Sequence, residues 1–141
     1  MAVSWPPVIV ADTNLLAYLW LPGDLTPAAE GVLAADAEWT SPLLWRSEFR
    51  SILIGAVRRR ALSVARAAEI AAAAEAQLHG REFVVESASV LTLANRSGCS
   101  AYDCEFVALA QDLGVMLVTN DREILRAFPD RAVSLVDFTA R

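Results

Sequence analysis

Two short segments of the chain are apolar at every position, and a polar residue follows each of them. Residues 8–11 and 115–118 have the pattern of central strands in a parallel sheet, because helices cover both faces of such strands. Residues 38–40, 83–85 and 132–136 fit shorter strands. These segments alternate with helical ones, which predicts an α/β fold with a mainly parallel sheet.

Helical segments fill the stretches between the strands, and several have a recognisable beginning or end. Ser63 and Ser100 are suited to cap helix beginnings, and Gly80 and Gly114 to end helices. The expected helices cover residues 15–21, 27–37, 42–60, 63–80, 87–97 and 100–113, and another begins at Asn120. The helices over 42–60 and 63–80 are predicted to form a hairpin. Because no repeat, linker or low-complexity tail interrupts this pattern, we expect one domain over residues 1–141.

Carboxylates follow both of the clearest strands. Asp12 comes directly after residues 8–11, and Asp121 comes three residues after residues 115–118. A helix that returns to a parallel sheet begins at the edge where ligands bind, which is the carboxyl edge of the strands. Asp103 stands in the first turn of the helix that precedes residues 115–118. The three carboxylates are therefore predicted to converge at this edge.

Glu48 is a fourth candidate because of its place on a helix. At about 100° per residue, it lies on the arc bounded by Leu44 and Ile52, which faces the core. No basic residue stands four positions away to form a surface pair with it. An acid on the core-facing side of a helix needs an interaction partner from elsewhere in the fold.

Each of the four acids also has a structural interpretation. Asp103 and Asp121 are suited to the beginnings of helices, Asp12 to a turn, and Glu48 to a buried pair with an arginine. Taken together, however, two carboxylates about 4 Å apart repel by ~4 kcal/mol at an effective dielectric constant of 20. Four of them at one edge require either protonation or a cation. An all-oxygen ligand set suits Mg²⁺ or Mn²⁺ and supports phosphoryl transfer.

The composition narrows the classes of function. All 12 basic residues of the 141 are arginine, which excludes P-loop NTPases and Schiff-base chemistry because both need lysine. A receiver domain also needs a lysine, and a phosphatase of the haloacid-dehalogenase type would have an aspartate where Asn14 stands. One histidine, His79, argues against a Ser-His-Asp system or a multi-histidine zinc site. Cys99 and Cys104 are expected to be reduced thiols in the core.

The order of these residues resembles the PIN-domain ribonucleases, and among them most of all the VapC toxins of bacterial type II toxin–antitoxin pairs. The resemblance spans residues 8–136, and its most specific part is 100–125. It implies a three-layer fold with a central, mainly parallel five-stranded sheet between helices. The residues that carry it are Asp12-Thr13-Asn14, Glu48, Ser100-Ala101-Tyr102-Asp103 and Thr119-Asn120-Asp121.

The resemblance also implies the site and its reaction. Asp12, Glu48, Asp103 and Asp121 would be the catalytic residues and would hold one or two Mg²⁺ or Mn²⁺ ions. Thr13, Asn14, Thr119 and Asn120 would support them. The implied reaction is single-strand endoribonucleolytic cleavage by metal-activated water, which leaves a 5′-phosphate and a 3′-hydroxyl. The implied partners are the RNA substrate, a cognate antitoxin and a second copy of the chain.

The charge of the chain bears on the choice of partner. A net charge of −5 argues against nucleic acid. Two Mg²⁺ ions would bring it to −1 and reverse the field at the site. The only basic run, Arg58-Arg59-Arg60, is either a solvated helix end or a contact for RNA or antitoxin.

Two other functions stay open, a PIN nuclease that processes RNA without being a toxin and a non-catalytic interaction module. No apolar stretch is long enough to span a bilayer, so a cytoplasmic protein is expected.

Overall fold

The computed structural model describes residues 8–140 and has a parallel five-stranded sheet at its centre, in the order β3-β2-β1-β4-β5. The strands are β1 (Val8–Ala11), β2 (Glu38–Pro42), β3 (Glu82–Phe83), β4 (Met116–Val118) and β5 (Ala132–Val133). In the central pairs, Ile9 lies opposite Trp39 on one side and Met116 on the other. The strand order reverses between β1 and β4, and ligands bind beyond the strand ends at such a point.

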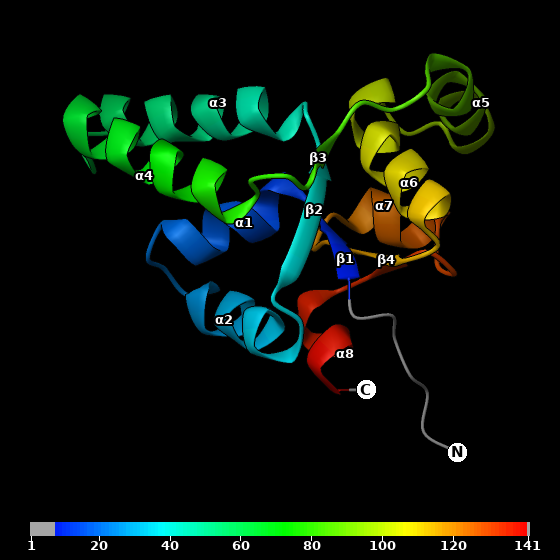
Figure 1. Cartoon of the computed structure of the whole chain (residues 1–141), viewed down its shortest axis with the longest axis horizontal. Coiled ribbons are helices and arrows are strands. Elements are labelled where there is room, and N and C mark those ends of the chain that lie inside the picture. Colours follow the sequence, from blue (N-terminus) through cyan, green and yellow to red (C-terminus); the bar gives the residue numbers. More distant parts are fainter. Residues whose placement is uncertain (1–7, 141) are drawn as a thin grey trace.

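Helices cover both faces of this sheet (Figure 1). They are α1 (Thr13–Trp20), α2 (Thr26–Ala35), α3 (Trp45–Arg58), α4 (Val64–Gln77), α5 (Ser87–Ser97), α6 (Ala101–Leu113), α7 (Arg122–Ala127) and α8 (Leu135–Ala140). α5, α6 and α7 lie on one side, whereas α1 to α4 lie on the other, with α8 against α2. α3 and α4 form the predicted hairpin, which extends away from the sheet.

The strands β1 and β4 are apolar at every position because the sheet is covered on both faces. Val10, Ala11, Leu117 and Val118 are fully buried, and α6 packs across β1, β2 and β4. Both cysteines are free and buried, as predicted. Within residues 8–140, no helix has both the length and the apolar character that crossing a membrane requires.

Most helix ends follow the predicted signals. The Ser63 hydroxyl accepts a hydrogen bond from the backbone N–H of Arg66, and Ser100 does the same for Asp103. Gly114 ends α6 in the left-handed conformation, with φ of 67°, which a glycine adopts without strain. α4 ends at Gln77, three residues before the predicted Gly80.

The expected strand over 132–136 is wrong at its carboxyl end. The strand β5 stops at Val133, and Leu135 begins helix α8. Two side chains satisfy the first backbone N–H groups of this helix, since Asn120 Oδ1 accepts from Leu135 and Ser134 Oγ accepts from Asp137. Capping therefore outweighs the strand preference of Val136.

Three other boundaries also differ from the prediction. Pro42 ends β2 instead of opening a helix, because the backbone N–H of Leu43 donates to Phe83 on β3 and keeps the chain extended. The strand β3 covers residues 82–83, and Val84 lies outside it. The helix α1 begins at Thr13, two residues early, because Asp12 caps it.

Candidate metal centre

Four carboxylates line one cavity of about 360 Å³ at the carboxyl edge of β1 and β4. They are Asp12, Glu48, Asp103 and Asp121, and each comes from a different part of the chain. The other lining residues are Thr13, Asn14, Ser51 and Ile52. The structure thus brings together the four acids that the sequence singles out.

Asp12 is the most buried of these acids, with 8% of its surface exposed. Its Oδ1 accepts from the backbone N–H of Thr13 at 2.8 Å, and its Oδ2 accepts from the Thr119 hydroxyl at 2.6 Å. Burial raises the pKa of Asp12 to about 6, and the charges of Glu48 and Asp103 add to this rise, whereas the two hydrogen bonds oppose it. A nearby cation would favour the ionised carboxylate.

Glu48 projects from the first turn of α3 and is half-buried. Its Oε1 accepts from the Thr13 hydroxyl at 2.7 Å. Burial raises its pKa, and the charge of Asp103 adds to the effect. Within residues 8–140, Glu48 forms no ion pair, so the interpretation as a buried pair with an arginine does not hold.

Asp103 and Asp121 stand at the beginnings of α6 and α7. Burial raises the pKa of Asp103, and the charge of Asp121 raises it further. Asp121 is the N-cap of α7, since its Oδ1 accepts from the backbone N–H of Ile124 at 3.0 Å. Asp121 therefore caps α7 and also lines the acidic cavity. The sequence predicts Asn120 at the beginning of this helix, but the cap is the next residue.

Two threonines connect the acids to one another. The Thr119 hydroxyl is fully buried, donates to Asp12 and accepts from the backbone N–H of Asp121 at 2.9 Å. Thr13 connects Asp12 to Glu48, through its backbone N–H and its hydroxyl respectively. These hydrogen bonds hold the carboxylates of Asp12 and Glu48 and the backbone of Asp121 in place.

The two asparagines of the predicted support differ in their position. Asn14 lines the cavity, and its amide nitrogen lies 3.4 Å from both Asp12 Oδ2 and Thr119 Oγ1. Its Oδ1 is buried and has no hydrogen-bond partner among residues 8–140. Asn120 is not part of the lining and instead accepts from the backbone of Leu135.

The donor set fits a hard divalent cation in kind. It consists of carboxylate, hydroxyl and amide oxygens, the ligands that Mg²⁺ and Mn²⁺ prefer, together with the unpartnered Asn14 Oδ1. No three histidine, cysteine or acidic side chains in the described part of the chain are gathered closely enough to hold an ion as they stand. Binding of one ion by three or more of these side chains would therefore require rotation of the carboxylates toward one another.

Three residues in or near the acidic cavity are absent from the predicted site. Burial and the charge of Glu48 raise the pKa of Glu105, two residues after Asp103, which indicates a fifth carboxylate near the acids. Ser51 and Ile52 line the cavity one turn after Glu48, a spacing that helical periodicity alone could have indicated.

The three consecutive arginines lie away from the cavity. Arg58, Arg59 and Arg60 are exposed at the far end of α3 and do not line it. Arg58 follows Glu48 by ten positions, about 15 Å along a helix.

Comparisons with known proteins agree with this architecture. A family model described as the PIN domain matches residues 9–129. Among solved structures, PAE2754 from Pyrobaculum aerophilum is 19% identical with a TM-score of 0.74, and the match covers 94% of this chain and 87% of that one. A toxin-antitoxin complex from Klebsiella pneumoniae is 17% identical with a TM-score of 0.65, over 90% of this chain and 97% of that one. FitAcB from Neisseria gonorrhoeae is 15% identical with a TM-score of 0.66, over 91% and 98%.

No curated protein sequence matches the chain. The solved structures nevertheless share its arrangement of a central parallel sheet between two layers of helices, so the predicted α/β fold is confirmed.

Proposed function

The chain belongs to the PIN domain family, whose members are nucleases, and on this basis we propose that it is a Mg²⁺- or Mn²⁺-dependent single-strand endoribonuclease. The observation that supports this proposal most is the single cavity lined by Asp12, Glu48, Asp103 and Asp121. These four acids come from four separate parts of the chain and line one cavity where the strand order reverses. Such an arrangement suits one or two divalent cations and a phosphodiester substrate.

A divalent cation held by these acids would supply the positive charge that draws in the scissile phosphate and makes an attacking water more acidic. The residues of the chain orient the acids for this task. Thr119 and the backbone N–H of Thr13 hold the two oxygens of Asp12, and the Thr13 hydroxyl holds Glu48. Attack of water on phosphorus with release of the 3′-oxygen leaves a 5′-phosphate and a 3′-hydroxyl.

We propose further that the nuclease is the toxin of a type II toxin–antitoxin pair and acts in the cytoplasm. The similar Klebsiella pneumoniae structure is a toxin-antitoxin complex, and this chain matches 97% of that chain's length. An antitoxin encoded beside it would relieve growth arrest caused by its expression. Growth unaffected by expression of an active nuclease would favour RNA processing instead. Contact of Arg58, Arg59 and Arg60 with RNA or antitoxin stays a prediction.

Cleavage of single-stranded RNA tests the nuclease activity. The wild-type protein is expected to cleave RNA with Mg²⁺ or Mn²⁺ and to lose this activity with a chelator. We expect Asp103→Asn to lower the rate by at least about tenfold, because changes merely next to metal ligands already have effects of that size. The products should accept a 5′-terminal label only after phosphatase treatment, which identifies the 5′-phosphate.

The matched control lies on the same helix. Asp112→Asn removes an exposed carboxylate of α6 outside the cavity and should leave the cleavage rate unchanged. Equal activity of wild type and Asp103→Asn, or activity that persists in the chelator, would contradict the proposal. A chain that neither binds Mn²⁺ nor cleaves RNA would be better explained as an interaction module.

The homodimer implied by the resemblance has a candidate surface beside the acidic cavity. Val84 and Leu91 are 86% and 64% exposed, and both line a second, largely apolar cavity of about 450 Å³. Glu105 also lines this second cavity and is close enough to Glu48 for the charge of Glu48 to raise its pKa. A second copy packed here would cover exposed apolar side chains and bring two acidic cavities near each other.

Light scattering tests this surface. We expect the wild-type protein to have twice the mass of the 15.2 kDa chain, and the double substitution Val84→Asp and Leu91→Asp to give a monomer, because charge at a buried apolar contact opposes association. Val64→Asp, at a valine of α4 that is 66% exposed, should leave the mass unchanged. A monomeric wild type would refute this assignment.

A further inference from the structure

The beginning of α3 has no side-chain cap. Leu44 occupies the N-cap position and makes no side-chain hydrogen bond there. The backbone N–H groups of Arg46, Ser47 and Glu48 donate instead to the carbonyl groups of Leu43 and Leu44 in the turn before the helix. In α3 this end carries Glu48, so the interactions that hold it decide where that carboxylate lies.

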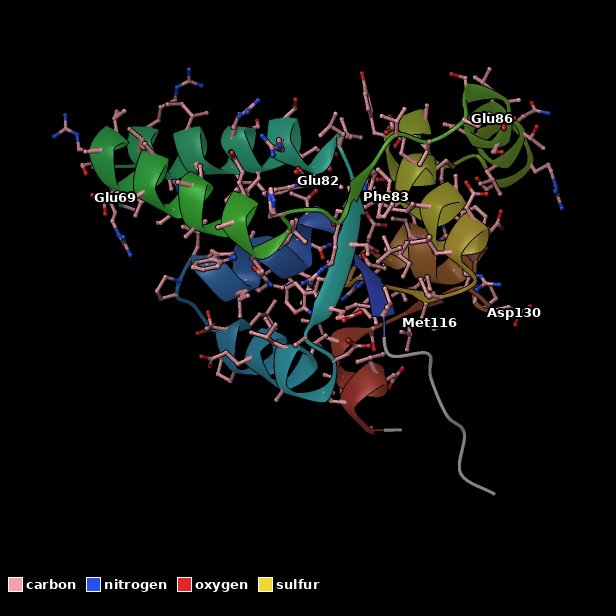
Figure 2. All side chains as sticks on the ribbon, in the orientation of Figure 1. Glu69, Glu82, Phe83, Glu86, Met116 and Asp130 are labelled. Atoms are coloured by element: carbon pink, nitrogen blue, oxygen red, sulfur yellow. The ribbon has the colours of Figure 1, made fainter. Side chains whose placement is uncertain are left out.

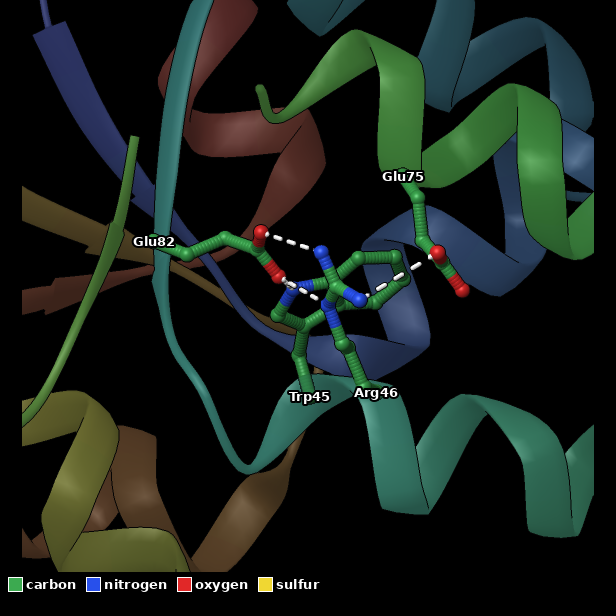
Figure 3. Close-up of polar contacts among 4 residues, drawn as sticks. All are labelled: Trp45, Arg46, Glu75 and Glu82. Carbon is green, nitrogen blue, oxygen red and sulfur yellow. Dashed lines mark hydrogen bonds and ion pairs between the residues drawn. The ribbon is translucent and has the colours of Figure 1, made fainter. Parts of the chain in front are cut away.

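Glu82 binds both residues that open α3 (Figure 3). Its Oε2 accepts from Arg46 Nε at 2.6 Å and from the Trp45 indole Nε1 at 2.7 Å. Its Oε1 accepts from Arg46 Nη2 at 2.7 Å. The two-point contact between carboxylate and guanidinium fixes the orientation of both groups, which a single ion pair does not.

The partners of this contact are anchored in the fold. The Glu82 side chain is only 13% exposed, and its backbone lies in β3 opposite Ser41 of β2. The indole of Trp45 is buried and packs on Phe49, with 5.6 Å between ring centres. The hydrogen bond from Arg46 holds the pKa of Glu82 below its usual value, so the carboxylate stays ionised at neutral pH. The contact therefore ties α3 directly to the edge of the sheet.

Glu48 lies in the same first turn of α3 as Arg46, and a different residue holds its side chain. It follows Arg46 by two residues, and the Thr13 hydroxyl contacts its carboxylate. We propose that Glu82 is a positioning residue, which holds Trp45 and Arg46 and thereby sets the place of Glu48 in the acidic cavity. This inference rests on the proposed function, since its effect is on metal binding.

Removal of Glu82 would leave identifiable groups unpaired. Arg46 would keep only the longer contact with Glu75 of α4, at 3.3 Å, and the Trp45 indole N–H would lose its acceptor. The hydrogen bond from Thr13 would then be the side-chain contact that holds the Glu48 carboxylate. The carboxylate would spend less time in the place where it can join the other three acids.

Calorimetric titration of the metal-free full chain with Mn²⁺ measures this effect without RNA. We expect Glu82→Ala to weaken Mn²⁺ binding by about tenfold or more, the size typical of residues that orient metal ligands. Glu82→Gln should weaken it less, because the amide oxygen still accepts one hydrogen bond. Glu69→Gln is the control, since Glu69 pairs with Arg66 near the far end of the hairpin, whereas Glu82 lies near the beginning of α3 (Figure 2).

A double-mutant cycle separates positioning from general loss of structure. In a Glu48→Gln background, Glu82→Ala should cause little further loss of Mn²⁺ affinity, because the residue through which it acts is already altered. Hydrogen exchange of the metal-free protein should be faster at residues 44–49 in Glu82→Ala and unchanged in Glu69→Gln. If Glu82→Ala fails to fold, the double-mutant cycle and the hydrogen-exchange measurement are made with Glu82→Gln and test the inference in its place.

The outcomes distinguish this inference from the proposed function. Wild-type binding of Mn²⁺ with unchanged affinity in the Glu82 variants would overturn the inference and leave the metal site intact. If Glu82→Ala lowers the Mn²⁺ affinity equally in the wild-type and the Glu48→Gln backgrounds, the inference is also overturned. A wild-type protein that binds no Mn²⁺ would overturn both.

Discussion

Replacement of Asp12 by asparagine should lower RNA cleavage by more than about a hundredfold, since changes next to metal ligands alone cost about 10–100-fold. The same substitution should make the metal-free protein more stable. Asparagine keeps the size of the side chain and an oxygen that can accept from Thr13. It removes, however, the charge of a residue that is only 8% exposed. Loss of activity with a gain in stability distinguishes an acid kept for function from one kept for the fold.

The gain in stability of metal-free Asp12→Asn should increase with pH. The pKa of Asp12 is about 6 in the folded protein and is expected near the ordinary value of 3.8 when unfolded. Between these values Asp12 binds more protons in the folded state than in the unfolded state, so its contribution to the stability of the metal-free wild type falls as pH rises from about 4 to 6 and is then level. The loss is at most about 3 kcal/mol. Asp12→Asn should lack this fall.

Chemical denaturation of both proteins in a chelator, at pH 4 and pH 8, measures the difference. The stability of Asp12→Asn relative to the wild type should be greater at pH 8 than at pH 4. Asp130→Asn, at an exposed site, serves as the control. Added Mn²⁺ should stabilise the wild type and leave Asp12→Asn unchanged. A metal-free Asp12→Asn less stable than the wild type at pH 8 would show that Asp12 is a structural residue.

Thr119→Val should reduce both metal binding and stability. Valine has nearly the same shape but cannot donate to Asp12 Oδ2 or accept from the backbone N–H of Asp121. A buried polar group left without a partner costs about 1–3 kcal/mol. Metal affinity should fall by about 10–100-fold because the orientation of Asp12 is lost. The pKa of Asp12 should rise further, since the hydrogen bond from Thr119 lowers it.

Two variants accompany this measurement. Thr119→Ser restores the hydroxyl and should recover most of the Mn²⁺ affinity. Thr92→Val removes an exposed hydroxyl that bonds only within α5 and should change neither property. Mn²⁺ affinity in Thr119→Val equal to that of the wild type would mean that Asp12 needs no orientation by its neighbour.

The parts of the fold that the sequence predicts well are those specified locally. The runs before Asp12 and Thr119 are buried central strands, because burial on both faces leaves a signal in the strand itself. The convergence of the acids follows from the rule that parallel strands share a carboxyl edge. Which acids would lie in one cavity was therefore predictable, whereas the hydrogen bonds that orient them were not.

Features that depend on distant partners were not predictable. Glu82 contacts Arg46 across 36 positions of sequence, and nothing near either residue indicates the other. Asn120 looks like the cap of the helix that follows it, yet it caps α8, which begins 15 residues later. Pro42 looks like a helix start, but hydrogen bonding of its neighbour to β3 holds it in a strand. In each case tertiary contacts outweigh a local preference.

Four helices begin around the acidic cavity. Asp12 and Asp121 are the N-caps of α1 and α7, and Glu48 and Asp103 stand in the first turns of α3 and α6. Each helix beginning carries a partial positive charge of up to about half a unit from its aligned peptide groups. These charges offset part of the repulsion among the acids before any cation is bound. We therefore expect the chain to fold without a metal ion and to bind the proposed ion in the folded state, unlike small domains that are unfolded without their ion.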